Sequence, residues 1–210
     1  MKLKNKLILA PMVDVSDASF RILCSNYGAS LTFVEMLSST ALARNNKATL
    51  KLFDVQKEEK PIGVQFMGNN SEDLIKAIKI VEDKVDIIDL NLGCPTLNIV
   101  NTGAGVALMK SPSKVKELVS SMVNSTNKPI SVKIRTGWDK SSENFLEIGK
   151  ICENIGVSMI TLHARTKNQA REGNSDWNKI KLLKEKLNIP VIGNGDLNYP
   201  EDIVKMLNET

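Results

Sequence analysis

A thiol and an amide side chain follow one apolar, β-branched segment of the sequence. The segment 87–91 is typical of a buried strand and ends at Asn91, and Gly93, Cys94 and Pro95 come next. Proline fixes φ and stops the strand, while Gly93 permits a backbone geometry that other residues resist. A lone cysteine is more often a buried structural residue. Because Cys94 lies in a turn past the strand end, we favour a chemical role for it.

Two cations lie in a second apolar segment. Lys133 and Arg135 alternate with Val132 and Ile134, so both point to one side of an expected strand. On the inner face of a barrel, two unpaired cations are costly unless an anionic or electron-rich ligand meets them. The alternative is a pair of solvated charges at a strand end, which the otherwise core-like segment disfavours.

Two further strand ends carry polar groups. His163 ends one expected strand and is followed by Arg165, although a lone histidine is more often structural than catalytic. The loop Gly193-Asn-Gly-Asp196 follows another strand, and its backbone N–H groups suit a phosphate at the start of a following helix. Together these groups predict a pocket for a phosphorylated cofactor, with substrate between the cofactor and Cys94.

The elements that must position these groups alternate strictly along the chain. Strands are expected at residues 7–10, 31–34, 61–66, 87–91, 129–134, 159–163 and 190–192, and helices at 17–27, 40–52, 71–81, 111–122, 142–155, 177–187 and 200–210. Strands that are apolar on both faces and alternate with helices indicate a parallel α/β fold. At 210 residues, one domain is expected.

Polar residues follow nearly every strand, and this distribution favours a (β/α)8 TIM barrel, whose site lies on the C-terminal face of the strands. A doubly wound sheet would gather its ligand groups at one switch point. Such a barrel takes eight strands and about 250 residues. We count about seven of the eight strand–helix units and expect the last strand to be absent.

The composition excludes several classes of protein. Hydrophobic residues make up 42% and charged residues 25%, as in ordinary globular proteins. The net charge of +4 is compatible with a nucleic-acid partner without indicating one. Three widely spaced cysteines and one histidine suggest neither a disulfide framework nor a metal centre. Because no signal-peptide core and no membrane-spanning run is present, we expect a cytoplasmic location.

A set of short motifs occurs in a specific order over almost the whole chain. They are Ala10-Pro-Met12, Asp17 with Phe20-Arg21, Glu35-Met36, Gln65-Phe-Met-Gly68, Asn91-Leu-Gly-Cys-Pro95, Gly103-Ala-Gly105, Leu108-Met109, Val132-Lys-Ile-Arg-Thr-Gly-Trp138, His163-Ala-Arg-Thr166, Gly173, Asp176-Trp177 and Gly193-Asn-Gly-Asp196. By this set the chain resembles the tRNA-dihydrouridine synthases, barrels that contain flavin mononucleotide (FMN) and reduce a uracil ring in tRNA.

The resemblance implies a role for each matching position. The residues that would bind FMN are Pro11, Met12, Val13, Gln65, Lys133, His163, Asn194, Gly195 and Asp196. Asn91 and Arg135 would hold the uracil, Cys94 would be the general acid, and no metal is implied. Hydride would pass from reduced FMN to C6, and Cys94 would protonate C5 from the opposite face. A thiol suits this role because it is mostly protonated at neutral pH.

The resemblance also implies partners and a boundary. NADPH or NADH would reduce the flavin again, since the redox chemistry belongs to the cofactor, and tRNA would be the partner of a monomer without membrane attachment. The family continues past Thr210 into an eighth strand with a Gly-Arg phosphate loop and a C-terminal helical tRNA-binding domain. Residues 1–210 would therefore be an incomplete flavin-binding barrel domain, with weak flavin binding and poor tRNA binding.

Two other functions stay open at this point. One is another FMN-barrel pyrimidine reductase, similar to dihydroorotate dehydrogenase and acting on a free base; the motifs at Lys133–Trp138 and His163–Thr166 argue against it. The other is a non-catalytic, truncated RNA-binding fragment that binds phosphates through a basic cluster. That cluster would consist of Lys133, Arg135, Arg165, Lys167 and Arg171.

Overall fold

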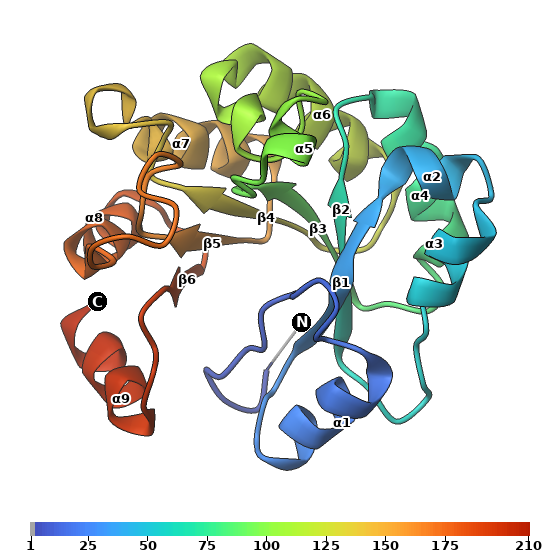
Figure 1. The fold of residues 1–210 in the computed structure, drawn as a ribbon, viewed down its shortest axis with the longest axis horizontal. Helices are drawn as coiled ribbons and strands as arrows, with labels where there is room; N and C mark the ends of the chain where they lie inside the picture. Colours follow the sequence, from blue (N-terminus) through green and yellow to red (C-terminus); the bar gives the residue numbers. More distant parts are fainter. Residues whose placement is uncertain (1–2) are drawn as a thin grey trace. The chain divides into compact units, whose positions relative to one another are not determined.

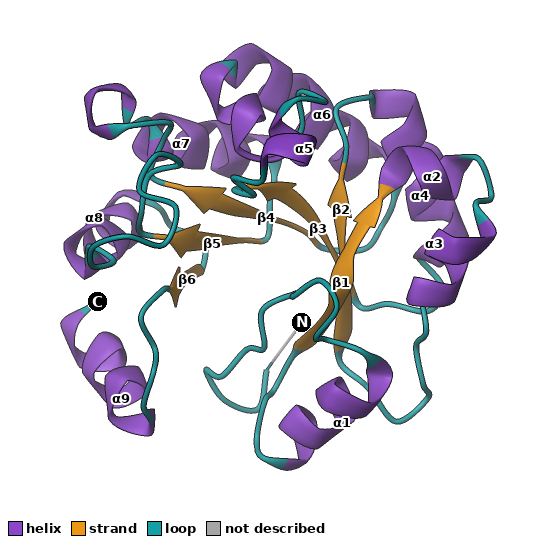
Figure 2. Ribbon diagram, viewed as in Figure 1, coloured by secondary structure: helices purple, strands orange, loops and turns teal. Residues whose placement is uncertain are grey.

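The computed structural model describes residues 3–210, in which helices and parallel strands alternate (Figures 1 and 2). The strands are β1 (Thr32–Ser38), β2 (Ile62–Met67), β3 (Ile87–Leu92), β4 (Ile130–Arg135), β5 (Met159–His163) and β6 (Val191–Asn194). The helices are α1 (Ala18–Asn26), α2 (Ser39–Ala43), α3 (Lys47–Leu52), α4 (Ser71–Val81), α5 (Leu97–Val100), α6 (Pro112–Ser125), α7 (Phe145–Ile155), α8 (Trp177–Lys186) and α9 (Pro200–Glu209), with 3-10 turns η1 (Gly105–Lys110) and η2 (Lys140–Ser142).

The chain forms two compact units. The first unit comprises the residues up to Leu90 together with Ser121–Ile130. Its strands β1 and β2 pair in parallel, as do β2 and β3. Helix α4 buries Leu74, Ala77, Ile78 and Val81, which recur at helical spacing on one face. The alternation of apolar strands and amphipathic helices therefore builds this unit as the sequence predicts.

The second unit comprises Asn91–Ser120 and Ser131–Thr210. Its strands β4, β5 and β6 pair in parallel in that order. Arg135 lies in register with His163, and His163 lies in register with Asn194. Residues in register on neighbouring strands point to the same face of a sheet. Three predicted site residues thus form one row across the ends of these strands.

The parallel α/β class is confirmed, but the first expected strand is not a full strand. Residues 7–10 contribute a single parallel bridge between Ile8 and Leu31. The hydrogen bonds from Leu9 N to Leu31 O and from Ser30 N to Leu7 O, at 3.0 and 2.9 Å, flank that bridge. The part of the chain that the structure describes therefore holds six strands, and residues 7–10 contribute only this bridge where a seventh strand was expected.

Two expected helices are interrupted for local reasons. The helix expected at 40–52 divides into α2 and α3, because Asn45 adopts a positive φ of 54°, a conformation that asparagine tolerates better than most residues. Asn46 then starts α3 by accepting a hydrogen bond from Thr49 N at 3.0 Å. The helix expected at 142–155 begins only at Phe145, since the carboxylate of Asp139 caps the preceding turn η2.

Helices α7 and α8 pack closely in the second unit. A Cβ atom at Gly149 would lie 2.8 Å from Leu183 Cδ1, so glycine lets the two helices approach. Within residues 3–210 no helix is both long enough and apolar enough to cross a bilayer.

Candidate active site

The Cys94 turn is held by the side chain of Asn91. Asn91 is buried at the end of β3, and its Oδ1 accepts hydrogen bonds from Gly93 N at 3.0 Å and Cys94 N at 2.8 Å. The Cys94 thiol is half-buried and donates to Thr96 Oγ1 at 3.4 Å. The predicted amide and thiol are therefore brought together, and the amide shapes the turn that presents the thiol.

Gly105 closes the same turn from the far side. Val106 N donates to the Cys94 carbonyl at 3.1 Å. Gly105 has a φ of +61°, and a Cβ atom built there would lie 2.8 Å from the Cys94 carbonyl oxygen. Only glycine meets both the backbone conformation and the close approach at this position.

Arg135 reaches the Cys94 turn from β4. Its Nε donates to Gly93 O at 3.0 Å, and its Nη1 donates to Thr166 O at 2.8 Å and Ala170 O at 3.0 Å. Only 5% of the residue is exposed. Burial, followed by the nearby charge of Arg165, lowers the pKa of Arg135 to about 10. Three backbone carbonyl groups thus accept hydrogen bonds from the Arg135 guanidinium, which was expected to need a ligand.

His163 lies among cations at the end of β5. Burial and then the charges of Lys133, Arg135 and Arg165 lower the pKa of His163 to about 3, against an opposing effect of Asp196. Lys133 Nζ donates to Asn194 Oδ1 at 3.2 Å. His163 is therefore a neutral imidazole at neutral pH, in a face whose remaining charge is positive.

Arg165 connects His163 to the loop that follows β6. Its Nη2 forms an ion pair with both carboxylate oxygens of Asp196, at 2.7 and 2.9 Å, and donates to Gly173 O. Its Nη1 lies 3.3 Å from His163 Nε2. Its Nε is a buried donor that has no hydrogen-bond partner within residues 3–210.

The carboxylate of Asp196 is committed to the protein. Partial burial raises the pKa of Asp196, but the hydrogen bond from Ser175 N, at 2.6 Å, and the Arg165 guanidinium lower it more, so that the net pKa lies below its usual range. Asp196 therefore shapes the loop after β6, and its charge is compensated there.

Gly195 completes the loop after β6. It has a φ of +111°, and a Cβ atom there would lie 2.6 Å from Ser175 Oγ and 3.2 Å from His163 Cδ2. Trp177 Nε1 donates to Gly195 O at 3.0 Å. The start of α8 thus fixes the loop that was predicted to hold a phosphate.

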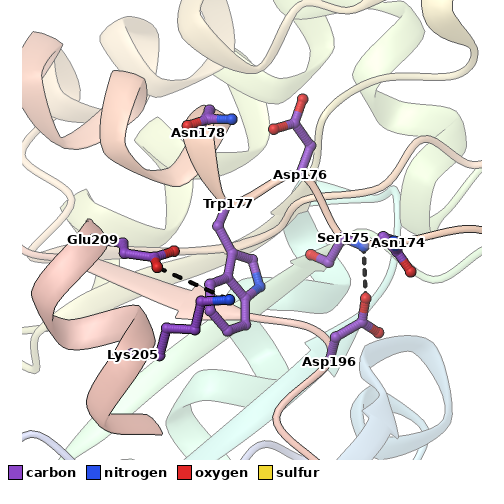
Figure 3. Close-up of a pocket in the computed structure, with 8 residues that line it drawn as sticks. All are labelled: Asn174, Ser175, Asp176, Trp177, Asn178, Asp196, Lys205 and Glu209. Atoms are coloured by element: carbon purple, nitrogen blue, oxygen red, sulfur yellow. Dashed lines mark hydrogen bonds and ion pairs between the residues drawn. The ribbon is translucent and has the colours of Figure 1, made fainter. Parts of the chain in front are cut away.

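A pocket of about 500 Å³ lies beside this loop, between the start of α8 and α9 (Figure 3). Its charged lining consists of the three carboxylates of Asp176, Asp196 and Glu209 and the ammonium of Lys205. Each of these carboxylates has a cationic partner, Arg165 for Asp196, Lys179 for Asp176 and Lys205 for Glu209. The pocket lining therefore offers little surplus positive charge, whereas cations outnumber anions on the face around His163.

The first unit carries the other predicted cofactor residues. Met12 and Val13 are exposed, in a loop closed by hydrogen bonds between the Ser16 hydroxyl and the backbone of Met12, at 2.9 and 3.0 Å. Glu35, at an irregularity in β1, accepts from Asp14 N at 3.3 Å. Pro11 begins this loop. The sequence thus presents apolar groups on a firmly bonded loop.

A buried ion pair supports that loop from behind. Arg21 bonds both carboxylate oxygens of Glu59, at 2.6 and 3.0 Å, and both residues are almost fully buried. Arg21 Nη1 also donates to Ser16 O at 2.6 Å. Because Ser16 closes the Met12 loop, the ion pair fixes the position of that loop.

Gln65 is buried on β2 and bonds within the first unit. Its Nε2 donates to Asp89 Oδ2 at 2.8 Å, and the two residues lie in register on neighbouring strands. The first unit therefore places Gln65 beside Asp89. The other predicted residues described above belong to the second unit and lie in or directly after β3 to β6: Asn91, Cys94, Lys133, Arg135, His163, Asn194, Gly195 and Asp196.

Sequence reasoning missed several residues that build the site. Arg165 was assigned only to a basic cluster, yet its spacing of two from His163 could have suggested a shared role. Thr96 lies two residues from Cys94, but its residue type did not mark it as a partner of the thiol. Gly105 was noted only as part of a motif, without its contact with the Cys94 carbonyl. Ser175 gave no signal, because its hydrogen bond with Asp196 joins segments far apart in the sequence.

The fold is similar to that of a solved structure: histamine dehydrogenase from Rhizobium sp. 4-9 superposes on this chain with a TM-score of 0.65. The match covers 99% of this chain and 39% of that chain, at 12% sequence identity. At this identity the likeness concerns the fold alone.

The sequence comparisons define the family. The sequence model of the dihydrouridine synthase family matches residues 8–210. The tRNA-dihydrouridine synthase B of Pasteurella multocida is 41% identical over 211 residues, covering 100% of this chain and 63% of the relative. That of Shewanella oneidensis is 38% identical over 201 residues, covering 95% of this chain and 62% of the relative. The chain belongs to the dihydrouridine synthase family, and it spans a little under two thirds of the length of these relatives.

Proposed function

We propose that this chain carries the catalytic site for flavin-dependent reduction of uridine to 5,6-dihydrouridine in tRNA, with NADPH or NADH as the reductant. The observation that supports it most is the Cys94 turn, which Asn91, Gly105 and Arg135 hold at the end of β3. Membership of the family and the names of the relatives agree with this activity. We also propose one catalytic domain over residues 1–210, a monomeric state without a metal, and a cytoplasmic location.

The residues present fit a phosphorylated flavin. Lys133, neutral His163 and the buried, unpartnered Nε of Arg165 offer hydrogen-bond donors in the second unit. Asn194 and Gly195 are proposed to contribute at the phosphate end, with Asp196 acting through its ion pair. In the first unit Pro11, Met12 and Val13 offer an apolar surface and Gln65 an amide. Bound in its reduced form, FMN supplies the hydride for uracil C6.

Cys94 is proposed to hold the proton that is delivered to uracil C5. Its thiol is half-buried and donates a hydrogen bond to Thr96 Oγ1. This hydrogen bond gives the S–H group a defined direction. A general acid must lie within hydrogen-bond reach of the atom that it protonates. The contacts that hold the turn support this proposal: Asn91 Oδ1 accepts from two amide groups of the turn, and Gly105 permits the Cys94 carbonyl to pack closely.

Asn91 and Arg135 are proposed to line the uracil site. Both also hold the Cys94 turn, Asn91 through its Oδ1 and Arg135 through Gly93 O. A substitution at either residue should therefore disturb the acid as well as the binding of the base.

The basic-cluster alternative is weakened by burial. Arg135 and Arg165 are 5% and 6% exposed and bond carbonyl or carboxylate groups of the chain. Guanidinium groups in such positions are poorly placed to neutralise RNA phosphates.

The experiment that tests the proposal is flavin retention followed by turnover. The purified chain is mixed with FMN and passed through a gel-filtration column, and the absorbance spectrum of the protein peak is recorded. A retained flavin band, and dihydrouridine formed in tRNA with NADPH, would support the proposal. A colourless protein that still binds tRNA would overturn it in favour of an RNA-binding fragment, and reduction of free uracil or orotate but not tRNA would overturn it in favour of a free-base reductase.

A further inference from the structure

The chain contains one histidine, His163, and its surroundings determine which ring nitrogen carries the proton. A neutral imidazole has one N–H donor and one acceptor nitrogen, whereas a guanidinium can only donate. Arg165 Nη1 lies 3.3 Å from His163 Nε2. Nε2 must therefore be the acceptor in this pair.

Arg165 is itself held in place from two sides. Asp196 bonds its Nη2 with both carboxylate oxygens, and Gly173 O accepts from the same nitrogen. Asp196 is fixed in turn by Ser175 N at 2.6 Å. Proteins select a histidine tautomer through a hydrogen bond to one ring nitrogen, because that bond decides which of the two nitrogens carries the proton.

We propose that Arg165 and Asp196 are positioning residues that fix His163 as the Nδ1–H tautomer, so that the ring offers an N–H donor to an acceptor atom of the bound ligand. The ligand class is an electron-rich group with a carbonyl oxygen or an unprotonated ring nitrogen. The inference rests on the proposed function, since it deepens the role of His163 toward a flavin.

The charges around the ring agree with this assignment. Lys133 and Arg135 on β4 and Arg165 after β5 are cations that act on His163, and Asp196 after β6 is the opposing anion. An imidazolium would have to donate from Nε2 toward the Arg165 guanidinium, which has no acceptor. The neutral ring removes this conflict and still provides one donor.

The test is nuclear magnetic resonance of the ligand-free chain labelled with ¹⁵N-histidine. Because His163 is the one histidine, the spectrum contains a single imidazole, and the two ring nitrogens are distinguished by their couplings to the carbon-bound ring protons. We expect Nδ1 to show the shift of a protonated nitrogen and Nε2 that of an unprotonated nitrogen at pH 7. A ring protonated at Nε2, or at both nitrogens, would overturn the proposal.

Variants test the roles of the two positioning residues. Arg165→Met and Asp196→Asn should convert the single tautomer into a mixture, and Arg165→Lys should restore part of the preference because lysine also donates. Lys150→Gln is the matched control: it removes an exposed ion pair with Glu153 in the same unit and should leave the spectrum unchanged. Unaltered ¹⁵N chemical shifts of the His163 ring in folded Arg165→Met would overturn the positioning role. If Arg165→Met does not fold, Asp196→Asn tests that role, and the wild-type spectrum still decides the tautomer.

Flavin titration of the same samples separates this inference from the proposed function. Flavin binding with the Nε2–H tautomer would overturn the inference and leave the proposed function standing. The Nδ1–H tautomer without flavin binding would overturn the proposed function and leave the tautomer assignment standing.

Discussion

Gly105→Ala is expected to distort the Cys94 turn, and the chain offers a matched control for it. Gly105 and Gly173 both lie in the second unit and have nearly the same φ, +61° and +62°. The backbone strain of an alanine, about 1 to 2 kcal/mol, is therefore the same at both positions. The surroundings differ, because a Cβ atom at Gly105 meets the Cys94 carbonyl oxygen at 2.8 Å, whereas at Gly173 the nearest atom is Gln169 Nε2 at 3.8 Å.

The expected difference follows from that contact. Moving the Cys94 carbonyl away breaks its hydrogen bond with Val106 N, which contributes about 1 kcal/mol. Overpacking adds about 1 kcal/mol or more. Gly105→Ala should thus lower the free energy of unfolding by about 2 kcal/mol more than Gly173→Ala does.

Urea unfolding followed by circular dichroism measures this difference. A second readout is the rate at which an aromatic disulfide modifies Cys94 in a Cys24→Ser background, where Cys152 is buried. The rate should change in Gly105→Ala and not in Gly173→Ala. Equal unfolding free energies for the two variants, within about 0.5 kcal/mol, together with equal thiol rates, would refute the account of the turn.

Two further predictions concern buried charge. The unfolded chain takes up a proton on His163 near pH 6.5, whereas the folded protein does so only near pH 3. The free energy of unfolding should therefore fall as the pH falls through this window. At pH 5, urea unfolding should show that wild type has lost about 1 to 2 kcal/mol relative to His163→Gln, and parallel pH profiles of the two proteins would contradict this. Arg21→Met leaves Glu59 buried without its partner and should lower the free energy of unfolding by about 3 to 5 kcal/mol. Lys150→Met, which removes a surface ion pair with Glu153, should lower it by less than about 1 kcal/mol. Equal losses in the two variants would refute the supporting role of Arg21.

The sequence predicted the elements well because their signals are local. The alternation of apolar strands with amphipathic helices such as α4 indicates the parallel α/β class. Capping residues such as Asp17, which accepts a hydrogen bond from Phe20 N, indicate where helices begin. The segment 7–10 was overestimated, since an apolar stretch does not reveal how many ladder pairs it makes. Asn45 was missed as a break, because its positive φ is one of several conformations that asparagine adopts.

The candidate site was predictable in its residue types and less so in their roles. Lys133 and Arg135 were expected to need a ligand, yet Arg135 donates to carbonyls at positions 93, 166 and 170. Asp196 was expected to line the phosphate end of the flavin, and this stays a prediction; the sequence did not show that its carboxylate pairs with Arg165. Such contacts join segments that lie far apart in the sequence, and no local pattern shows which of several polar partners a buried charge takes.

The central claim, that Cys94 is the acid of a uridine reductase, is tested most directly by measuring dihydrouridine in tRNA by mass spectrometry. Wild type, Cys94→Ala and Cys24→Ala are compared, each with FMN, NADPH and tRNA that lacks dihydrouridine; Cys24 is a half-buried thiol of the first unit. We expect product with wild type and Cys24→Ala and a loss of about 10²-fold or more with Cys94→Ala. Equal product from Cys94→Ala, or none from a wild-type chain that retains FMN, would contradict it.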